Sequence, residues 1–351
     1  MRIAVVFRRP PPQSDRDGAL RLRRLARRFA ARGHEVRVYC LGWWGSDTRQ
    51  FELDDVVYES VTFDTPPLFY TRIPGLLARH RPDVVLASAS PPGAVVSARI
   101  GATLARAPLV CEWFGDEPEV EGSPWTGTAA RVPTRVVTPS ELQRTRVREF
   151  GATEENTTVV PQSIDFSLVA DTDPAERRDV VYARRLDEDA NLESLLLALA
   201  ELRGEDGWTA TVIGDGPQRA DYERQARDLG LADRVEFAGE CDREERVAIY
   251  RGAHAFVQTA RRELFAEELL WALAAGCVGI VEYQGDSSAH ELVERRERGI
   301  RVTDMEALDD AIEEAWSYGF QDIDESFRSF DHTAVVDDYI ELFRNCGVEA
   351  P

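Results

Sequence analysis

The stretch "DVVYARRLDEDANLESLLLALA" (179–200) of this 351-residue chain contains the repeating unit from which its fold class can be predicted. It opens on β-branched and aromatic residues, continues as a short charged loop, and ends in leucines that share one side of a helix. These leucines are Leu192, Leu195, Leu196 and Leu199. The pattern predicts a buried strand that leads through a loop into a helix packed on the sheet.

The same alternation recurs along most of the chain. Before residue 179 we predict strands at 3–7, 35–39, 83–87, 109–113, 135–138 and 157–160, with helices at 92–106 and 140–150. After the opening stretch we predict strands at 208–214, 234–239, 254–258 and 277–281. Strands that alternate with helices indicate an α/β fold with parallel sheets covered on both faces.

Two such series predict two Rossmann-like domains. The polar segment 165–178 contains a proline and is the expected hinge, so we place the domains at 1–165 and 166–330. The last pattern, at 332–345, is a helix with no strand after it, and we expect residues 331–351 to pack back on the first domain. In open parallel sheets ligands bind at the carboxyl ends of strands, which is where we look for functional residues.

The composition is strongly acidic. The chain carries 63 Asp and Glu against 42 Lys and Arg, a net charge of −21, and all 42 are arginine. Because salt screens self-repulsion, such an excess suits concentrated salt, and we predict a halophilic archaeon as the source. The alternative is a merely acidic protein from a GC-rich genome.

The five cysteines and five histidines are scattered, without CxxC, HExxH or other metal-like spacing. The longest uncharged apolar run, 269–281, is too short to cross a bilayer. We therefore expect a reduced, cytoplasmic protein without a metal site.

A predicted helix at 19–32 is rich in arginine. Its arginines are Arg21, Arg23, Arg24, Arg27, Arg28 and Arg32, and its apolar face is Leu22, Leu25, Ala26 and Phe29. One interpretation is an ordinary solvated face. The other is a surface that attracts phosphates or anionic lipid at the inner face of a membrane. Nucleic acid is disfavoured, because no recognised reader motif accompanies the arginines.

Three segments at predicted strand ends have residue types suited to chemistry. In "VIGDGP" (212–217) the glycines allow close backbone approach, and the following helix offers amides to a phosphate, although Gly-Pro turns end many strands. Arg184 and Arg185 could neutralise a diphosphate, or be an exposed pair balanced by nearby carboxylates. Glu263, after the strand at 254–258, can accept hydrogen bonds from sugar hydroxyls.

In this order and spacing the segments resemble the family 4 retaining nucleotide-sugar glycosyltransferases of the GT-B fold. The resemblance covers most of the chain and implies a donor-binding second domain and an acceptor-binding first domain. In the first half it rests on "ARGHEVRVY" (31–39), "RPDVVLA" (81–87), "APLV" (107–110) and the segment 135–165. In the second half it rests on "RRL" (184–186), "GDGP" (214–217), "RVEFAG" (234–239), "ELF" (263–265) and "AAGCVGIV" (274–281).

The resemblance implies roles for particular residues. Arg185 would stabilise the departing diphosphate and Glu263 would orient the transferred sugar, both as catalytic residues. The donor-binding residues would be Arg184, Gly214, Asp215, Gly216, Pro217, Gly239, Glu240, Leu264, Phe265, Ala266, Glu267 and Glu268. On the acceptor side we place Asp17, Gly18, Ser88 and Trp113. The resemblance implies no metal and no covalent cofactor, since the nucleotide sugar is the substrate.

The donor half departs from the family pattern at two important positions. The family usually has two glutamates separated by seven residues; here Trp271 stands where the second, ribose-binding one is usual. Glu267 or Glu268, one turn earlier on the same helical face, could replace it. The usual lysine after the Arg-Leu element is Ala190, and Arg184 could restore the lost charge.

Smaller departures occur elsewhere. Asn191 stands where glycine is common, Ala266 follows Phe265 where glycine is usual, and Ser88 replaces a frequent histidine. The segment 110–135 is shorter than usual, so we expect part of the acceptor wall to be missing.

The sequence therefore predicts a retaining, metal-independent glycosyltransferase of glycan biosynthesis. It would move a hexose-type sugar from a nucleoside-diphosphate sugar to a glycan or lipid-linked acceptor. The first alternative is a catalytically inactive GT-B relative that acts as a binding or regulatory partner, and the second is another GT-B enzyme such as a nucleotide-sugar epimerase. A dinucleotide oxidoreductase is disfavoured, because "FRRPPPQSDRDG" (7–18) lacks GxGxxG.

Overall fold

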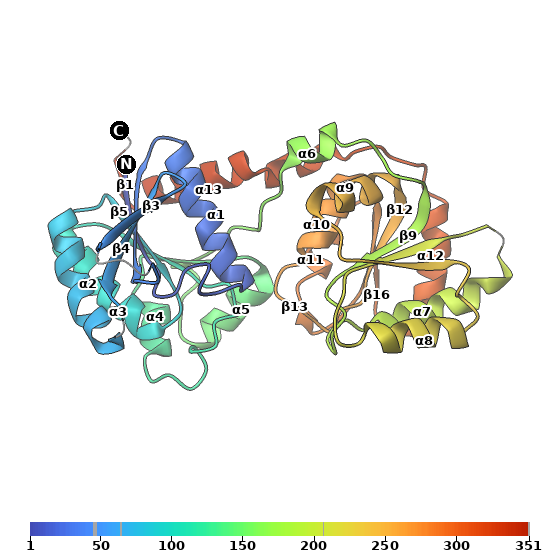
Figure 1. Ribbon diagram of the computed structural model, residues 1–351, viewed down its shortest axis with the longest axis horizontal. Helices are drawn as coiled ribbons and strands as arrows, with labels where there is room; N and C mark the ends of the chain where they lie inside the picture. Colours follow the sequence, from blue (N-terminus) through green and yellow to red (C-terminus); the bar gives the residue numbers. More distant parts are fainter. Residues whose placement is uncertain (45–47, 64, 206, 350–351) are drawn as a thin grey trace. The chain divides into compact units, whose positions relative to one another are not determined.

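The chain forms two α/β units (Figure 1). The structure, a computed structural model, describes residues 1–44, 48–63, 65–205 and 207–349. Unit 1 comprises Met1–Pro161 and Val335–Pro351, and unit 2 comprises Gln162–Ala334. The chain thus passes between the units at 161/162 and 334/335, each four residues from a predicted boundary, at 165/166 and 330/331.

Unit 1 is built on an eight-stranded sheet of order β3-β4-β2-β1-β5-β6-β7-β8. Its neighbouring strands are parallel, except that β3 pairs antiparallel with β4 at one edge. The strands are β1 (Arg2–Val6), β2 (Glu35–Leu41), β3 (Gln50–Leu53), β4 (Val56–Thr62), β5 (Val84–Ser88), β6 (Leu109–Glu112), β7 (Arg135–Thr138) and β8 (Thr157–Val159). The helices are α1 (Asp17–Ala31), α2 (Pro66–His80), α3 (Pro92–Ala105), α4 (Thr126–Arg131), α5 (Glu141–Glu149) and α13 (His332–Asn345), which starts in unit 2.

Helices cover both faces of this sheet, as predicted. Ile3 and Val5 of β1 pack with α1 and α13, whereas Ala4 and Val6 face α2 and α3. Both faces of β1 are therefore buried, which explains its uninterrupted apolar sequence. The prediction that the C-terminal helix packs on the first domain agrees with the place of Tyr339 in the same core as β1.

Inside unit 1, the buried guanidinium of Arg21 binds both segments that connect this unit to unit 2. Arg21 of α1 donates to the carbonyl oxygens of Val160 and Pro161 at 2.7 and 2.8 Å, and to the hydroxyl of Tyr339 at 2.7 Å. Its Nε donates to the carboxylate of Glu112 at 3.0 Å, and the Tyr339 hydroxyl bonds to the same carboxylate. One charged pair thus links α1, β6, α13 and the segment that leads into unit 2.

Unit 2 is built on a parallel six-stranded sheet of order β11-β10-β9-β12-β14-β16. These strands are β9 (Arg178–Ala183), β10 (Ala210–Ile213), β11 (Val235–Gly239), β12 (Ala253–Gln258), β14 (Val278–Glu282) and β16 (Gly299–Val302); β13 (Arg262–Glu263) and β15 (Asp286–Ser287) form a small separate ladder. The helices are α6 (Phe166–Asp171), α7 (Leu192–Glu201), α8 (Arg219–Asp228), α9 (Arg243–Gly252), α10 (Glu267–Ala274), α11 (His290–Val293) and α12 (Leu308–Trp316). Short 3₁₀ turns are η1 (Leu202–Gly204), η2 (Met305–Ala307) and η3 (Glu325–Phe330).

Candidate functional site

Arg184 and Glu263 come together at the carboxyl edge of the unit 2 sheet. Arg184 directly follows β9, and Glu263 ends β13, just after β12. The Arg184 guanidinium forms an ion pair with the Glu263 carboxylate and donates to the carbonyl oxygen of Arg262 at 3.0 Å. The two side chains are 16% and 20% exposed, so water screens the pair weakly. Burial, the largest single cause, disfavours the charged guanidinium, but Glu263, Tyr182, Asp187 and Asp189 together outweigh it, and the pKa of Arg184 is raised.

The neighbouring Arg185 lies in solvent. Its side chain is 73% exposed, and its Nε lies 3.9 Å from the carboxylate of Asp187. Consecutive residues of an extended chain point to opposite sides, so only one of the two arginines can face Glu263. The structure puts Arg184 there, while the sequence prediction gave the catalytic cation to Arg185.

Gly214 and Gly216 let two loops of this edge pack against each other. Gly214 has a φ of +121°, and a Cβ added there would lie 2.0 Å from the carbonyl oxygen of Arg184. A Cβ on Gly216 would lie 2.3 Å from the carbonyl oxygen of Leu186. The Gly214 amide also donates to the carbonyl oxygen of Gly239 at 2.7 Å. The sequence prediction attributed these glycines to ligand approach, whereas here they permit the approach of protein backbone.

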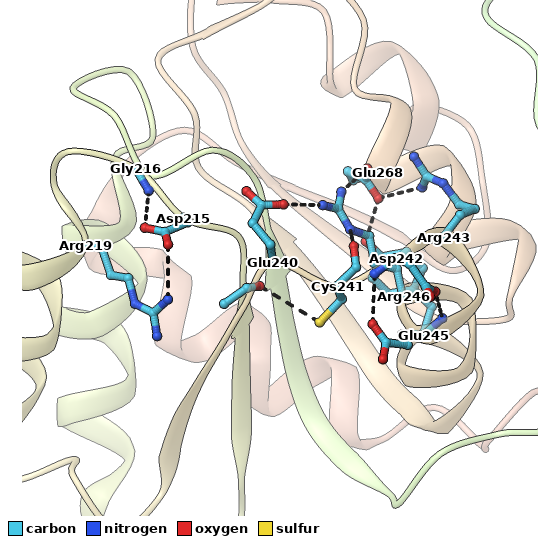
Figure 2. A network of polar contacts seen from close by, with 12 residues as sticks. Asp215, Gly216, Arg219, Glu240, Cys241, Asp242, Arg243, Glu245, Arg246 and Glu268 are labelled. Carbon is cyan, nitrogen blue, oxygen red and sulfur yellow. Dashed lines mark hydrogen bonds and ion pairs between the residues drawn. The ribbon is translucent and has the colours of Figure 1, made fainter.

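Asp215 lies between these glycines and bonds within its own loop (Figure 2). Its carboxylate accepts from the Gly216 amide at 2.6 Å and from the Arg219 guanidinium at 3.4 Å. Asp215 and Pro217 are both exposed. A phosphate at this helix N-terminus would have to replace the Asp215 carboxylate on the Gly216 amide.

Glu268 is an anchor between α9 and α10 (Figure 2). Its carboxylate accepts from Arg243 at 2.9 Å, from Arg246 at 2.8 Å and from the Tyr250 hydroxyl at 2.6 Å. Exposed Glu240 pairs with the other side of Arg246 at 3.0 Å. Because three donors already bind Glu268, its arrangement fits a structural role better than the predicted contact with a ribose.

Glu267 is therefore a better candidate than Glu268 to replace the ribose-binding glutamate that the family usually has at the position of Trp271. Its side chain is 22% exposed, accepts from the Gln162 amide at 3.4 Å, and lies 3.9 Å from the Arg243 guanidinium. Trp271, one turn later, is 4% exposed, and the same Arg243 lies 4.7 Å from its ring centroid. The indole N–H of Trp271 is buried and has no hydrogen-bond partner among the described residues.

A polar cluster that the sequence analysis missed surrounds Ala190. Asn191 has a φ of +52°, a conformation that Asn tolerates in place of glycine. Its side-chain amide donates to Thr259 O at 2.9 Å and to the Glu282 carboxylate at 3.2 Å, and its amide oxygen accepts from Arg261 at 2.9 Å. Ala190 is fully buried. Arg261 thus brings a cation near the position where the resemblance expects lysine, from a segment adjacent to "ELF".

The start of α10 is held by a serine that was not predicted. Ser288 donates through its amide to the carbonyl oxygen of Glu263 at 2.8 Å and through its hydroxyl to that of Leu264 at 2.9 Å. Phe265 and Ala266, which were predicted to bind the donor, are buried directly before α10.

Unit 1 contains a cavity of about 160 Å³ beside the carboxyl ends of β1, β5 and β6. Of the four predicted acceptor residues, Gly18 and Ser88 line it. Asp17 and Trp113 do not line it; Trp113 is 3% exposed and its ring centroid lies 5.8 Å from that of Phe150, inside the core.

Charged side chains, absent from the prediction, give this cavity its character. They are Arg8, Arg9, Arg16, Asp15, Glu112, Asp116, Glu117 and Glu119. Arg8 pairs with Glu119 and donates to the Tyr70 hydroxyl at 3.0 Å. The carboxylate of Glu117 accepts from two backbone amides at 2.8 Å, yet burial, together with Asp116, raises the pKa of Glu117 to about 8. Carboxylates outnumber arginines here, so the cavity favours hydroxyl groups over phosphates.

The arginine helix is largely neutralised. Arg21 is buried in the core, as described above. Asp54 forms ion pairs with Arg27 at 3.1 Å and with Arg23 at 3.7 Å. Arg32 pairs with Asp337 of α13. The helix therefore combines a structural role with an exposed face that is less cationic than its sequence suggests.

Within 1–44, 48–63, 65–205 and 207–349 no group of three or more His, Cys, Asp or Glu side chains is arranged to hold a metal ion. Across the same residues none of the helices has the length and apolar character needed to span a bilayer.

Both units of the chain match families of known glycosyltransferases. Residues 19–168 match the model described as Glycosyltransferase Family 4, and residues 168–322 match Glycosyl transferases group 1. The alpha-monoglucosyldiacylglycerol synthase of Streptococcus pneumoniae is 25% identical over 157 residues, 40% of this chain and 35% of that protein. The 2-deoxystreptamine glucosyltransferase of Streptomyces kanamyceticus is 28% identical over 144 residues, 36% of this chain and 37% of that protein. The alignments thus span little more than a third of either relative.

Solved structures resemble the whole chain. The Anabaena protein Alr3699/HepE in complex with UDP has a TM-score of 0.76 at 19% identity, covering 98% of this chain and 100% of that one. A glycosyltransferase from Rickettsia africae has a TM-score of 0.74 at 15% identity, with 99% of both chains covered. The two consecutive family matches cover residues 19–322 and the fold agrees throughout, so the chain belongs to the family 4 glycosyltransferases and has the GT-B fold.

Proposed function

We propose that this protein transfers a hexose-type sugar from a nucleoside-diphosphate sugar to a hydroxyl of a glycan or lipid-linked acceptor. The observation that supports it most is the Arg184–Glu263 pair at the carboxyl edge of the sheet, within the segment that matches the group 1 model. Glu263 can accept hydrogen bonds from the sugar, while Arg184 and exposed Arg185 supply charge for a diphosphate. In the reaction the bond between the anomeric carbon and the diphosphate oxygen breaks, a bond from the acceptor oxygen to the anomeric carbon forms, and the proton of the acceptor hydroxyl passes to the departing diphosphate.

Retention at the anomeric carbon and no need for a metal are proposed on the resemblance. A cytoplasmic location is proposed on the scattered cysteines, and a halophilic source on the acidic, lysine-free composition. UDP-glucose is the first donor to test, because a similar structure holds it and both curated relatives have glucosyl in their names. Arg261 and Glu267 are the residues that we propose in place of the family's lysine and second glutamate.

The proposal is tested by calorimetric titration of the whole protein in high salt with UDP-glucose, UDP and a panel of other nucleotide sugars. We expect saturable binding of one donor, weakened at least about tenfold, or about 1.4 kcal/mol, in Glu263→Ala. Glu325→Gln changes an exposed carboxylate paired with Arg328 and should bind as the wild type does. Transfer of labelled sugar from that donor to extracted acceptors then tests catalysis directly.

A second candidate is a catalytically inactive relative with a binding or regulatory role. It is favoured by Ala190 and Trp271, which stand buried where the resemblance expects a lysine and a glutamate. Absence of binding to every nucleotide sugar in the same titration would support this candidate and overturn the first.

Membrane contact through α1 is proposed on the lipid named in one relative and on the arginine-rich sequence of this helix. The test is co-sedimentation with vesicles that contain anionic lipid. Reversing Arg24, Arg27 and Arg28 to glutamate should abolish binding; unchanged binding, or none by the wild type, would remove the proposal.

A further inference from the structure

Unit 2 has a cavity of about 380 Å³ at the edge opposite to Arg184 and Glu263. Leu273 and Cys277 line it between the end of α10 and the start of β14, and Phe327 of η3 also lines it. Since the strands are parallel, their amino ends lie at this edge and their carboxyl ends at the candidate donor site. The volume is within the range of small-molecule pockets.

Three arginines of the segment 295–298 line the cavity: Arg295, Arg296 and Arg298. Most arginines mentioned so far are in ion pairs, as expected for a chain of net charge −21. Among the described residues, by contrast, no carboxylate lies within ion-pair distance of these three. A concentration of unpaired cations in so acidic a protein indicates a place where an anion binds.

Of the three arginines, Arg296 lies against a buried aromatic ring. Its guanidinium lies 4.0 Å from the ring centroid of Phe327, which is 1% exposed, and donates to the Ser326 hydroxyl at 3.3 Å. Burial lowers the pKa of Arg296, and Asp324 opposes this shift only in part. A half-buried guanidinium on an aromatic face retains donors for a ligand.

The two carboxylates that line this cavity do not form ion pairs with its arginines. Asp324 lines it, but its side chain caps η3 by accepting from the Ser326 amide at 2.9 Å. Glu297 lines it as an exposed residue. Three arginines against two carboxylates give the lining a net charge of +1, opposite in sign to the molecule.

Arg298 gives the cavity its shape. It donates to the carbonyl oxygens of Gly319 at 2.8 Å and Gly276 at 3.1 Å, so it joins two loops across the edge. Gly276 has a φ of +91°, and a Cβ there would lie 2.2 Å from the carbonyl oxygen of Gln321. These backbone contacts keep the loops in place around Arg295 and Arg296.

We propose that this cavity binds a phosphate group, with Arg295 and Arg296 as its ligands and Arg298 as a positioning residue. Two guanidinium groups match the charge and hydrogen-bonding geometry of a phosphate dianion. The ligand is either free phosphate or the phosphate ester of a small molecule, whose organic part would lie against the cavity wall that includes Leu273. This site is independent of the proposed transferase reaction.

The test is thermal unfolding of the whole protein at constant ionic strength, in potassium chloride with and without inorganic phosphate or phenyl phosphate. UDP is present throughout at a fixed concentration, so that a donor site that binds UDP does not contribute to the phosphate effect. A ligand that binds only the folded state stabilises it by RT ln(1 + [L]/Kd), so Tm rises with the concentration of a ligand that binds. We expect phosphate to raise Tm in the wild type and in Arg301→Gln, whose exposed side chain pairs with Glu294 outside the cavity.

The same increase should fall by half or more in Arg295→Gln and disappear in Arg296→Gln. If Arg296→Gln does not fold, exposed Arg295 decides the outcome alone. A larger effect of phenyl phosphate points to a phosphate ester, and a smaller one to free phosphate; both support the site. No increase beyond that of chloride, or an equal increase in the arginine variants, would overturn the proposal.

Discussion

The guanidinium of Arg184 is paired with the carboxylate of Glu263, although 79 residues separate them in the chain. The pair joins the loops after β9 and β12 at the carboxyl edge of the unit 2 sheet. The pair also holds the Arg184 guanidinium and the Glu263 carboxylate in position at this edge in the absence of a ligand. Under the proposed function, the donor sugar competes with Arg184 for the carboxylate oxygens of Glu263. Arg184 would then be available to pair with the departing diphosphate.

A double-mutant cycle measures this pair. We expect Arg184→Gln and Glu263→Gln each to lower the free energy of unfolding, and the double variant to show a coupling of about 1–3 kcal/mol, because the charges are shielded from water. Arg185→Gln is the matched control and should change stability by less than about 0.5 kcal/mol, since that side chain is exposed. Urea unfolding provides the measurement, and additive effects of the two substitutions would contradict a stabilising pair.

Glu268 should matter more for stability than for donor binding. Glu268→Gln removes the negative charge that pairs with Arg243 and Arg246, and we expect a loss of about 2 kcal/mol in the free energy of unfolding. Glu240→Gln, which removes one exposed partner of Arg246, should cost less than about 1 kcal/mol. Equal losses in chemical denaturation would show that Glu268 is not the anchor.

Gly214 should not tolerate alanine. The substitution combines a positive φ with a Cβ 2.0 Å from the Arg184 carbonyl oxygen, and we expect it to cost more than about 3 kcal/mol or to prevent folding. Gly230→Ala is the control, because its φ is also positive but the nearest atom, on the flexible Arg203 side chain, is 3.4 Å away. It should cost about 1–2 kcal/mol, the conformational penalty alone. Differential scanning calorimetry separates the two cases, and similar losses would refute the packing argument.

The buried Arg21 cluster should dominate the stability of unit 1. Arg21→Met leaves the Glu112 carboxylate buried without its cation, and we expect a loss of about 3–5 kcal/mol. Tyr339→Phe, which removes one hydroxyl from the cluster, should cost about 1–3 kcal/mol. Arg32→Gln disrupts an exposed pair between α1 and α13 and should cost less than about 1 kcal/mol. A near-neutral Arg21→Met would mean that apolar packing holds α13 in place without the charge.

Glu117 should make stability depend on pH. Its pKa in the folded protein is about 8, against an ordinary value of 4.5, so the folded state keeps a proton that the unfolded chain has lost. The free energy of unfolding therefore falls as pH rises from 4.5 to about 8, by at most about 1.4 kcal/mol per pH unit. Glu117→Gln should remove this slope, as measured by urea unfolding across that range. An unchanged slope in the variant would assign the dependence to other groups.

The α/β architecture could be predicted because its buried parallel strands are short apolar runs. The strands predicted at 135–138 and 234–239 correspond to β7 and β11, and the final helix was placed at 332–345, as observed. Strands β4 and β16 and helix α2 were not predicted. Their sequences give weaker signals, since β16 contains Arg301 and α2 contains Pro74.

The candidate site was predicted less completely than the fold. Spacing indicated that Glu263 and the arginine pair share one edge of the sheet, but it could not indicate which arginine turns inward, because that depends on a single residue of register. Nor could it reveal that Arg243 and Arg246 bind Glu268, since contacts between helices depend on their packing. The glycines of "GDGP" were noticed because they allow close approach; in the structure backbone carbonyl oxygens approach Gly214 and Gly216, and the approach of a ligand stays a prediction.

The two crossings of the chain have a consequence for biosynthesis. All eight strands of unit 1 leave the ribosome early, yet α1 keeps the apolar face around Phe29 uncovered until Tyr339 and Phe343 have been translated. Unit 2 is a continuous segment and is complete before that point. The half that is synthesised second can therefore finish folding first, and a nascent chain stalled before residue 335 would present an open hydrophobic surface to chaperones and proteases.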